Sequence, residues 1–356
     1  MKIAFYINAI HEGGAERVMV NLAKQFSEHG YDALMITSFV SPWEYGLGEN
    51  VRRITLFREL NQGFLTKNIK LVRALRRVIK EEQPDVVISF MAEPNFRMLW
   101  ACRKKKIKKI ISIRNDPEKE YPNLVYRVLA KHLYKKADRI IFQTEEAQKW
   151  FPKKIQEKSC ILLNQVDEVF FNIKHQGVRH DIVATGRLVK QKNHTLLIRA
   201  FARISDQIED NLYIYGEGEL RRDLEQLISN LGLTRRIFLP GQIDNVAETL
   251  KSAKLYVLSS DYEGMPNALM EAMAMGLPCI STDCPCGGPH MIIDNGFDGI
   301  LVPVGDIKSL SESLVLLSKD KELNKSLSVN AKEKARLLFG KDKIYNEWRD
   351  YIENGR

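Results

Sequence analysis

The chain has 356 residues, a length that suggests two domains rather than one. Hydrophobic residues make up 44% of it and aromatic residues 9%, as in soluble proteins with hydrophobic cores. No run reaches the roughly 18–20 uninterrupted apolar residues of a membrane span. Five cysteines, an odd number in a chain of this size, argue against a disulfide framework and for a reducing cytoplasm. The segment MKIAFYINAI looks like a first strand without a small-residue cleavage site, so we expect no secretory signal.

The net charge of +9 is distributed unevenly. Residues 1–172 contain 30 Lys and Arg against 20 Asp and Glu, whereas residues 173–356 contain 24 against 25. Because one half is basic and the other is nearly neutral, we expect the two halves to meet different partners.

Short β-branched runs alternate with amphipathic helical patterns along the chain. In the first half the expected strands are 2–7, 32–39, 85–90, 109–115 and 139–144, with helices that include 15–29, 66–82 and 121–136. In the second half the expected strands are 181–186, 211–216, 236–241, 254–260, 278–283 and 299–304. This alternation predicts an α/β protein with two Rossmann-like, doubly wound parallel sheets, each covered by helices on both faces.

The polar, irregular segment 164–180 separates the two series and is the expected linker. We expect an N-terminal domain over 1–168 and a C-terminal domain over 169–340. A last helical pattern, 342–352, has no strand after it and could pack on either domain. Two such domains leave a cleft between the carboxyl ends of their strands, where open parallel sheets bind ligands.

The stretch DYEGMPNALMEAMAMG (261–276) places one carboxylate, Glu263, before a helix and a second, Glu271, inside it. Pro266 suits a first helical residue and Gly276 a helix stop, which predicts a helix over about 266–275. The N-terminus of such a helix favours a phosphate, whereas carboxylates are good acceptors for vicinal sugar hydroxyls. A nucleoside diphosphate sugar has this layout, although a capped surface helix with two solvated glutamates would give the same spacing.

Two other strand ends point to the same ligand. In VATGRLVKQKNH (183–194), Gly186 ends a strand and is followed by Arg187 and Lys192, which can neutralise a diphosphate. An ordinary basic surface loop is the alternative. Gly13 and Gly14 follow the first expected strand and allow a phosphate or an acceptor to come close, but they do not form G-x-G-x-x-G and are weak by themselves.

These segments, together with YGEGEL (215–220) and EGMPNALMEAMAMGLPCISTD (263–283), resemble the retaining, nucleotide-sugar-dependent glycosyltransferases of family four, which have the GT-B fold. The resemblance covers essentially the whole chain and keeps the order of the motifs. It is closest to bacterial enzymes that build capsule, exopolysaccharide or O-antigen units on a lipid carrier. In this fold the final helix, here 341–356, crosses back onto the N-terminal, acceptor-side domain, and residues 169–340 bind the donor.

The resemblance assigns roles to individual residues. Glu271 would hold the donor ribose and Glu263 would face the transferred sugar, while Arg187 and Lys192 would stabilise the leaving diphosphate. The catalytic set is thus expected to be Arg187, Lys192 and Glu263. The remaining donor contacts implied are backbone or pocket positions, namely Gly13, Gly14, Gly186, Gly241, Ile243, Asn245, Gly264, Met265, Pro266 and Asn267.

One departure from the family pattern concerns a histidine that many relatives carry after the strand equivalent to 109–115. This chain has Arg114, Asn115 and Asp116 there, so the histidine's contact with the sugar is either absent or made by one of these three. An internal-return reaction needs no separate base, since the leaving diphosphate takes the acceptor proton and the enzyme mainly stabilises the separating charges.

We expect no metal and no cofactor. The chain contains no Asp-x-Asp motif, in agreement with an enzyme in which Arg and Lys replace a divalent cation. The fragment DCPCGGPH (283–290) offers Cys284, Cys286 and His290, but a structural zinc usually needs four ligands. A tight Pro/Gly loop over the donor pocket is the preferred interpretation.

Basic residues gather in the first half at 103–109 and 127–139 and on the amphipathic helix expected at 67–80, with Leu71, Leu75, Val78 and Ile79 on its apolar side. A solvated face is one explanation. Nucleic-acid binding lacks a recognisable module and interleaved aromatic residues. The resemblance favours attachment to the anionic inner face of the cell membrane, where a lipid-linked acceptor would lie.

The leading hypothesis is a metal-independent enzyme that moves a hexose or N-acetylhexosamine from a UDP-sugar to a lipid-linked oligosaccharide with retained configuration. Its partners would be the UDP-sugar, the lipid-linked glycan and an anionic membrane surface, but no nucleic acid, and it would be cytoplasmic and peripheral on the membrane. A nucleotide-sugar epimerase on the same fold and a non-catalytic sugar-nucleotide-binding scaffold subunit are the alternatives. An epimerase would need no acceptor, and decay to a scaffold is opposed by the intact acidic and basic residues.

Overall fold

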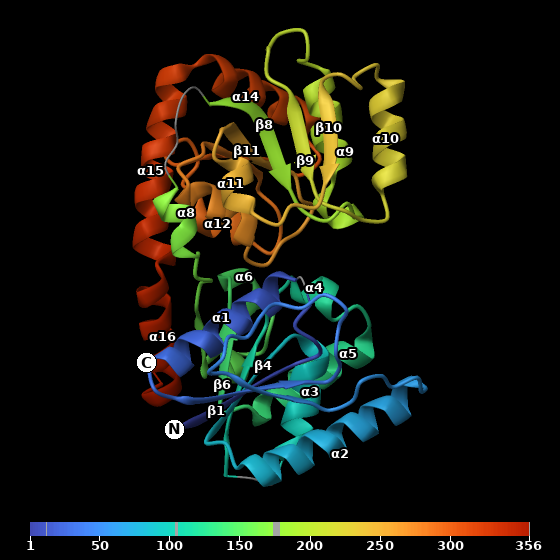
Figure 1. Cartoon of the computed structure of the whole chain (residues 1–356), viewed down its shortest axis with the longest axis vertical. Helices are drawn as coiled ribbons and strands as arrows, with labels where there is room; N and C mark the ends of the chain where they lie inside the picture. The colour runs from blue at the N-terminus through green and yellow to red at the C-terminus, as the bar shows by residue number, and fades with distance from the viewer. Residues whose placement is uncertain (12, 104–105, 174–178, 356) are drawn as a thin grey trace. The chain divides into compact units, whose positions relative to one another are not determined.

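The computed structural model describes residues 1–11, 13–103, 106–173 and 179–355, which form two compact units (Figure 1). The first unit comprises Met1–Asn164 with Ile344–Arg356, and the second comprises Gln165–Lys343. Each is built on its own parallel sheet, as the alternation of strands and helices in the sequence predicts.

The first unit contains a seven-stranded parallel sheet within the described residues, in the order β3-β2-β1-β4-β5-β6-β7. Its strands are β1 (Lys2–Ile7), β2 (Asp32–Thr37), β3 (Arg52–Thr55), β4 (Val86–Phe90), β5 (Lys108–Ser112), β6 (Arg139–Phe142) and β7 (Ser159–Ile161). Its helices are α1 (Gly14–Glu28), α2 (Phe64–Glu82), α3 (Ala92–Ala101), α4 (Pro117–Glu120), α5 (Leu124–Leu133), η1 (Tyr134–Lys136), α6 (Glu145–Lys149), α7 (Lys153–Gln156) and α16 (Lys341–Glu353).

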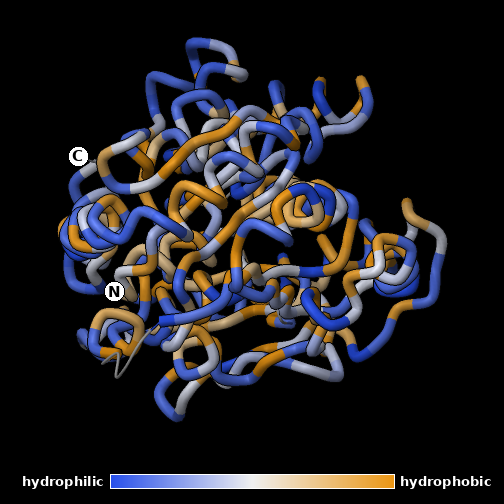
Figure 2. Tube along the Cα trace, turned by 90° about the horizontal axis from the view of Figure 1, so that it is seen from above, coloured by the Kyte–Doolittle hydropathy of each residue, from blue (hydrophilic) through white to orange (hydrophobic). Residues whose placement is uncertain are grey.

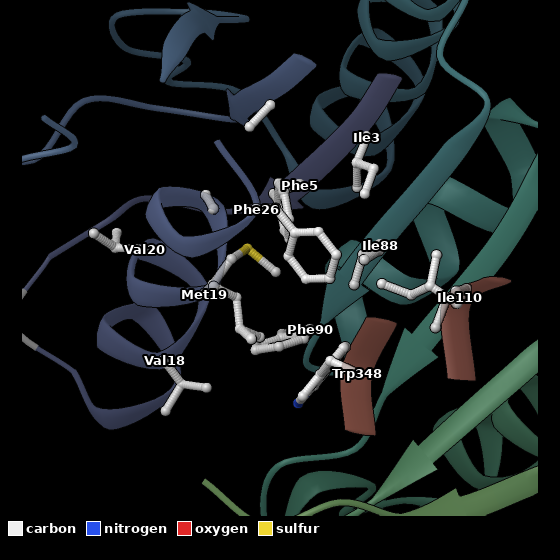
Figure 3. Packing of buried hydrophobic residues seen from close by; sticks show 14 of the residues in the cluster. Ile3, Phe5, Val18, Met19, Val20, Phe26, Ile88, Phe90, Ile110 and Trp348 are labelled. Carbon is white, nitrogen blue, oxygen red and sulfur yellow. The ribbon is translucent and has the colours of Figure 1, made fainter. Parts of the chain in front are cut away.

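Helices α1 and α16 share one hydrophobic core with the first sheet (Figure 3). Alternate residues of β1, such as Ile3 and Phe5, enter this core because successive side chains of a strand point to opposite faces. From α16, Trp348 is fully buried, and its ring centroid lies 5.9 Å from that of Phe90 on β4. The final helix therefore packs in the first unit, which settles the alternative that its sequence leaves open.

The second unit contains a six-stranded parallel sheet within the described residues, in the order β10-β9-β8-β11-β12-β13. Its strands are β8 (His180–Thr185), β9 (Leu212–Tyr215), β10 (Ile237–Gly241), β11 (Ala253–Leu258), β12 (Cys279–Thr282) and β13 (Ile300–Val302). Its helices are α8 (Glu168–Asn172), η2 (Lys190–Lys192), α9 (His194–Ala202), α10 (Arg221–Asn230), α11 (Val246–Leu250), α12 (Asn267–Ala274), α13 (Gly288–Ile292), α14 (Ile307–Lys319) and α15 (Lys321–Phe339). Helices α9, α10 and α14 bury their apolar sides on one face of this sheet.

Three details differ from the expectations. The boundary between the units lies at Asn164, and the segment expected to be an irregular linker contains α8, whose first turn is capped by the Asp167 carboxylate through a 3.1 Å bond from Val169 N. Residues 174–178 of that segment lie outside the described part of the chain.

Two strands, β3 and β7, are additional to the expected ones. Helix α12 begins at Asn267, so Pro266 is its N-cap and not its first helical residue.

Hydrophobic stretches along the chain are short and alternate with hydrophilic ones (Figure 2). Among the described residues, no helix has both the length and the apolar character needed to cross a membrane.

Candidate active site

The order of strands in the second sheet reverses between β8 and β11, which lie side by side. In doubly wound sheets a ligand binds at such a reversal, outside the carboxyl ends of the strands. The segment after β8 carries Gly186, Arg187 and Lys192, and the segment after β11 leads to Glu263. The fold thus brings these residues to the edge where a ligand is expected.

Lys192 and Glu263 form a direct ion pair across this reversal. Lys192 Nζ lies 2.5 Å from Glu263 Oε1, and Ser260 Oγ donates to the same oxygen at 2.7 Å. The two side chains are only 16% and 9% exposed, so each charge is stabilised largely by the other. The sequence gives the two residues separate roles and does not reveal this pair.

Short polar side chains connect the two segments. Asn193 Nδ2 donates to Asp261 Oδ1 at 2.7 Å, and Ser259 Oγ donates to Lys192 O at 2.9 Å. The backbone adds a bond from Asp261 N to Gln191 O at 2.8 Å. Sequence reasoning missed these residues, although asparagine, aspartate and serine directly after a strand are typical of such side-chain-to-backbone connections. These hydrogen bonds fix the two segments that carry Lys192 and Glu263 to each other.

The segment 283–290 packs directly on the backbone beside Glu263. Glu263 N donates to Pro285 O at 2.7 Å, and Cys286 N donates to Glu263 O at 2.9 Å. A Cβ atom on Gly288 would lie 1.8 Å from Gly264 O, so only glycine allows this approach. The Pro/Gly segment therefore covers the start of the candidate site.

The same segment carries the two cysteines considered as metal ligands. Both are buried, and burial raises the pKa of the Cys284 thiol to about 12, whereas a metal needs the thiolate. His290 Nδ1 lies 3.4 Å from Asp283 Oδ2. No group of three or more His, Cys, Asp or Glu side chains that could hold a metal occurs in the part of the chain that the structure describes.

Helix α12 carries the second glutamate of the motif. Glu271 is buried within the helix, and Gly276, at φ +68°, ends it in the left-handed conformation. Met265 is buried at the start of the helix, beside the Pro266 N-cap.

Two further expected residues lie at or just after the ends of other strands of the second sheet. Arg187, after β8, is exposed, so its guanidinium is accessible to an incoming anion. At the end of β10, Gly241 has φ +96°.

Two other expected donor contacts lie after β10. Asn245 caps α11 by accepting a 3.1 Å bond from Glu248 N, and Ile243 is half-buried. The carboxamide oxygen of Asn245 is therefore committed to the helix cap, and its backbone carbonyl accepts from Thr249 Oγ1 at 2.8 Å, which leaves its amino group for a ligand.

The remaining expected residues belong to the first unit. Gly13 is the N-cap of α1, and Gly14 is the first residue of the helix. A Cβ atom on Gly13 would lie 2.1 Å from the Glu16 carboxylate, so the side chain of Glu16 lies against the backbone of Gly13. After β5, Asp116 caps α4 by accepting from Glu118 N at 2.9 Å, and Asn115 Oδ1 accepts from Asp116 N at 2.9 Å. Both side chains thus serve the local turn.

Arg114, the third candidate for the absent histidine, is buried. Its guanidinium donates to Asn164 Oδ1 at 2.5 Å and stacks 4.4 Å from the centroid of the Phe90 ring. Burial lowers the pKa of Arg114 to about 9, and the carboxylates of Glu120 and Glu16 oppose this shift. Glu120, at the end of α4, is half-buried with a buried carboxylate oxygen, Oε2, and sequence reasoning missed it.

Comparisons with known proteins agree with this architecture. Residues 12–168 match the family model described as Glycosyltransferase Family 4, and residues 165–334 match Glycosyl transferases group 1. An uncharacterized glycosyltransferase of Methanocaldococcus jannaschii is 30% identical, with 89% of this chain and 91% of the relative covered. An α-1,4-N-acetyl-D-galactosaminyltransferase of Campylobacter jejuni, named for its GalNAc-GalNAc-diNAcBac-diphosphoundecaprenol acceptor, is 29% identical over 98% of this chain and 97% of the relative.

The solved structures include Anabaena HepE in complex with UDP and glucose, which superposes with a TM-score of 0.83 over 99% of both chains at 18% identity. This likeness confirms the predicted fold class, two Rossmann-like parallel-sheet domains of the GT-B type. The two family models and the relatives that match over nearly the full length establish that the chain belongs to the glycosyltransferases of family four.

Proposed function

We propose that this chain transfers a hexose or N-acetylhexosamine from a UDP-sugar to a lipid-linked oligosaccharide, with retained anomeric configuration and without a metal. The Lys192–Glu263 pair at the reversal between β8 and β11 is the observation that carries the proposal. The UDP complex of the Anabaena neighbour and the diphosphoundecaprenol-linked acceptor in the name of the Campylobacter relative support the two substrate classes.

The site suits a diphosphate leaving group. Arg187 is exposed and offers a planar fork of donors, whereas Lys192 offers a point charge that Glu263 already orients. Positive charges fixed before the reaction stabilise the negative charge that develops on the diphosphate as the bond to the sugar breaks. The departing diphosphate then accepts the proton of the attacking hydroxyl, so no separate base is required. Glu271 holds the donor ribose and Glu263 faces the transferred sugar.

The first test of this proposal is the thermal stability of the protein with UDP, GDP and ADP. A ligand that binds only the folded state stabilises it by about 2.7 kcal/mol at 100 times its dissociation constant. We expect a shift selective for UDP in the wild type and its loss in Glu271→Ala, because the buried carboxylate is the proposed ribose acceptor. Glu209→Ala, an exposed glutamate elsewhere in the second unit, is the matched control and should keep the full shift. An undiminished UDP shift in Glu271→Ala would contradict the assigned role.

We also propose that the first unit attaches to an anionic membrane surface through α2 and α5. Helix α2 carries six basic and two acidic residues and buries Leu71, Leu75 and Ile79, while Val78 of its expected apolar side is half-buried. Helix α3 packs against both α2 and α5. Beside the basic residues, large apolar side chains are exposed near the N-termini of α2 and α5, namely Phe64, Leu65, Ile69, Leu124, Val125 and Val128. Exposed apolar groups flanked by Lys and Arg suit an interface of headgroups and acyl chains. Of the basic run at 103–109, residues 104–105 lie outside the described residues.

Cosedimentation with vesicles tests this attachment. We expect the wild type to bind phosphatidylglycerol vesicles at low salt and to ignore phosphatidylcholine vesicles. Each basic residue near an anionic surface contributes about 1 kcal/mol, so Arg73→Glu/Arg77→Glu should weaken the partition by at least roughly 30-fold. Lys153→Glu/Lys154→Glu changes the net charge equally at exposed sites on α7 and should have little effect. Equal losses in the two double variants would indicate a nonspecific charge effect and would exclude α2 as the attachment site.

A further inference from the structure

The first sheet also reverses its strand order, between β1 and β4. The segments that follow these two strands, beginning at Asn8 and Met91, therefore lie where a doubly wound sheet binds a ligand. Arg97 of α3, the helix that follows Met91, joins the two segments because its Nη1 donates to Asn8 Oδ1 at 2.5 Å. Its Nε donates to Asn68 Oδ1 of α2 at 2.7 Å. This reversal is thus a built polar site within the first unit.

Met91, directly after β4, has φ +72° and ψ +158°, a backbone region that is populated almost only by glycine. Hydrogen bonds hold it there, since Met91 N donates to Ser112 O at 3.2 Å and Asn95 N donates to Met91 O at 3.0 Å. The residue is 37% exposed. A strained residue persists when its surroundings fix it, and such residues concentrate at ligand sites.

Glu120 makes the contact that fixes the next residue. Its Oε1 accepts a 2.6 Å hydrogen bond from Ala92 N, the first N–H of α3, where the helix dipole favours a negative charge. Its Oε2 is buried and has no hydrogen-bond partner among the described residues. The buried Nε of Arg114 likewise has none, although the two side chains attract each other electrostatically. The carboxylate is therefore tied to the turn by a single bond to Ala92.

We propose that Glu120 is a positioning residue whose carboxylate holds the Met91–Ala92 turn, and that this turn presents Met91 to the acceptor sugar and contributes to acceptor selection. The second part rests on the proposed function, whereas the first depends only on the geometry of the first unit. The acceptor is identified here by its chemistry, a sugar carried on a lipid diphosphate.

The ionisation of Glu120 gives the turn a pH dependence. Burial raises the pKa of Glu120 to about 7, against the opposing effects of the Ala92 N–H and Arg114. The titratable and charged groups facing it are Arg114 after β5, the adjacent Tyr121, and Tyr134 of η1. The carboxylate is ionised above about pH 7 and holds Ala92 with a charge-assisted bond, which protonation weakens. Because the pKa of Glu120 is raised in the folded state, protonation of Glu120 increases the free energy of unfolding as the pH falls through 7. A loosening of the turn at low pH would therefore not reflect global unfolding.

Hydrogen exchange at the Ala92 amide tests the positioning role, with rates corrected for the intrinsic effect of pH. We expect protection in the wild type to be about three- to tenfold lower at pH 6 than at pH 8, as the ionised fraction of a group with a pKa near 7 falls. Glu120→Gln keeps an oxygen acceptor but does not titrate, so its protection should be equal at the two pH values. Glu118→Gln, on the exposed side of α4, should behave as the wild type. A pH-independent wild type, or a pH-dependent Glu120→Gln, would overturn the proposal.

The acceptor role is tested by transfer to a short-chain polyprenyl diphosphate that carries one N-acetylhexosamine, together with direct binding of this probe by calorimetry. Glu120→Gln and Met91→Gly, whose glycine suits the observed φ, should each weaken the probe's binding at pH 8 severalfold and leave the KM for the donor unchanged. Unchanged binding of the probe, or equal changes for donor and acceptor, would remove acceptor selection from the turn. Failure of the proposed function itself would be seen separately, as absence of a UDP-dependent thermal shift in the wild type.

Discussion

We expect Arg187→Ala and Lys192→Met each to lower kcat by roughly 10²- to 10³-fold, the usual effect of removing one preorganised group that stabilises developing charge. In the proposed reaction the diphosphate leaves before the acceptor bond is complete, and these two side chains are its positive partners. Steady-state kinetics with saturating donor would measure the loss. Lys190→Ala removes an exposed lysine from the same segment and should leave kcat nearly unchanged.

The ion pair with Glu263 complicates the interpretation of Lys192→Met, because the substitution leaves a mostly buried carboxylate without its cation. The double variant Lys192→Met/Glu263→Gln removes both charges and should recover much of the lost thermal stability. Its kcat should still lie well below that of Glu263→Gln alone if Lys192 acts on the diphosphate, since Glu263 has a proposed role of its own at the sugar. Recovered stability together with a kcat equal to that of Glu263→Gln would show that Lys192 is only a structural partner of Glu263.

The sequence predicted the sheets well where strands are central and hydrophobic. β1, β4, β8 and β11 are buried runs between helices, and such runs allow few alternatives. Strands β3 and β7 were missed because they are short edge strands, RRIT and SCI, without a clear alternating pattern. Their pairing depends on neighbours that a local pattern does not reveal.

The candidate site shows the same division between local and distant information. That Gly186 and Glu263 follow strands could be predicted, because strand ends are local features. The Lys192–Glu263 bond joins residues 71 positions apart and depends on the adjacency of β8 and β11, which only the fold provides. The division into an acceptor-side and a donor-side domain remains a prediction, and so do the roles of the individual site residues.

Glu120 shows why a buried charge is hard to identify from sequence. The segment PEKE is typical of a solvated helical turn, and its neighbours Glu118 and Lys119 are indeed exposed. The carboxylate of Glu120 turns inward because Ala92 N, from a different helix, needs an acceptor at the start of α3. Neither the strained φ of Met91 nor this contact leaves a signal in the local pattern.

The largest effect on stability is expected at Asp298, whose carboxylate is fully buried in the second unit. Lys334 Nζ of α15 lies 2.8 Å from Asp298 Oδ2 and 2.8 Å from Asp294 Oδ2. We expect Lys334→Met to lower the free energy of unfolding by about 3 kcal/mol, because it leaves a buried carboxylate without its cation. Calorimetry should show a decrease in the Tm of roughly 6–12 °C for a unit of this size.

Two further variants distinguish the buried charge from the loss of a lysine. Lys325→Met removes an exposed lysine from the same helix and should change the Tm little. Lys334→Met/Asp298→Asn removes both charges but keeps an oxygen that can accept the 2.8 Å bond from Asp294 N, so it should recover most of the loss. The turn at 294–298 directly follows α13, whose Gly288 lies against Gly264. If Lys334→Met loses stability but keeps its UDP shift, the candidate site is held by its own hydrogen bonds and does not depend on the Lys334–Asp298 pair.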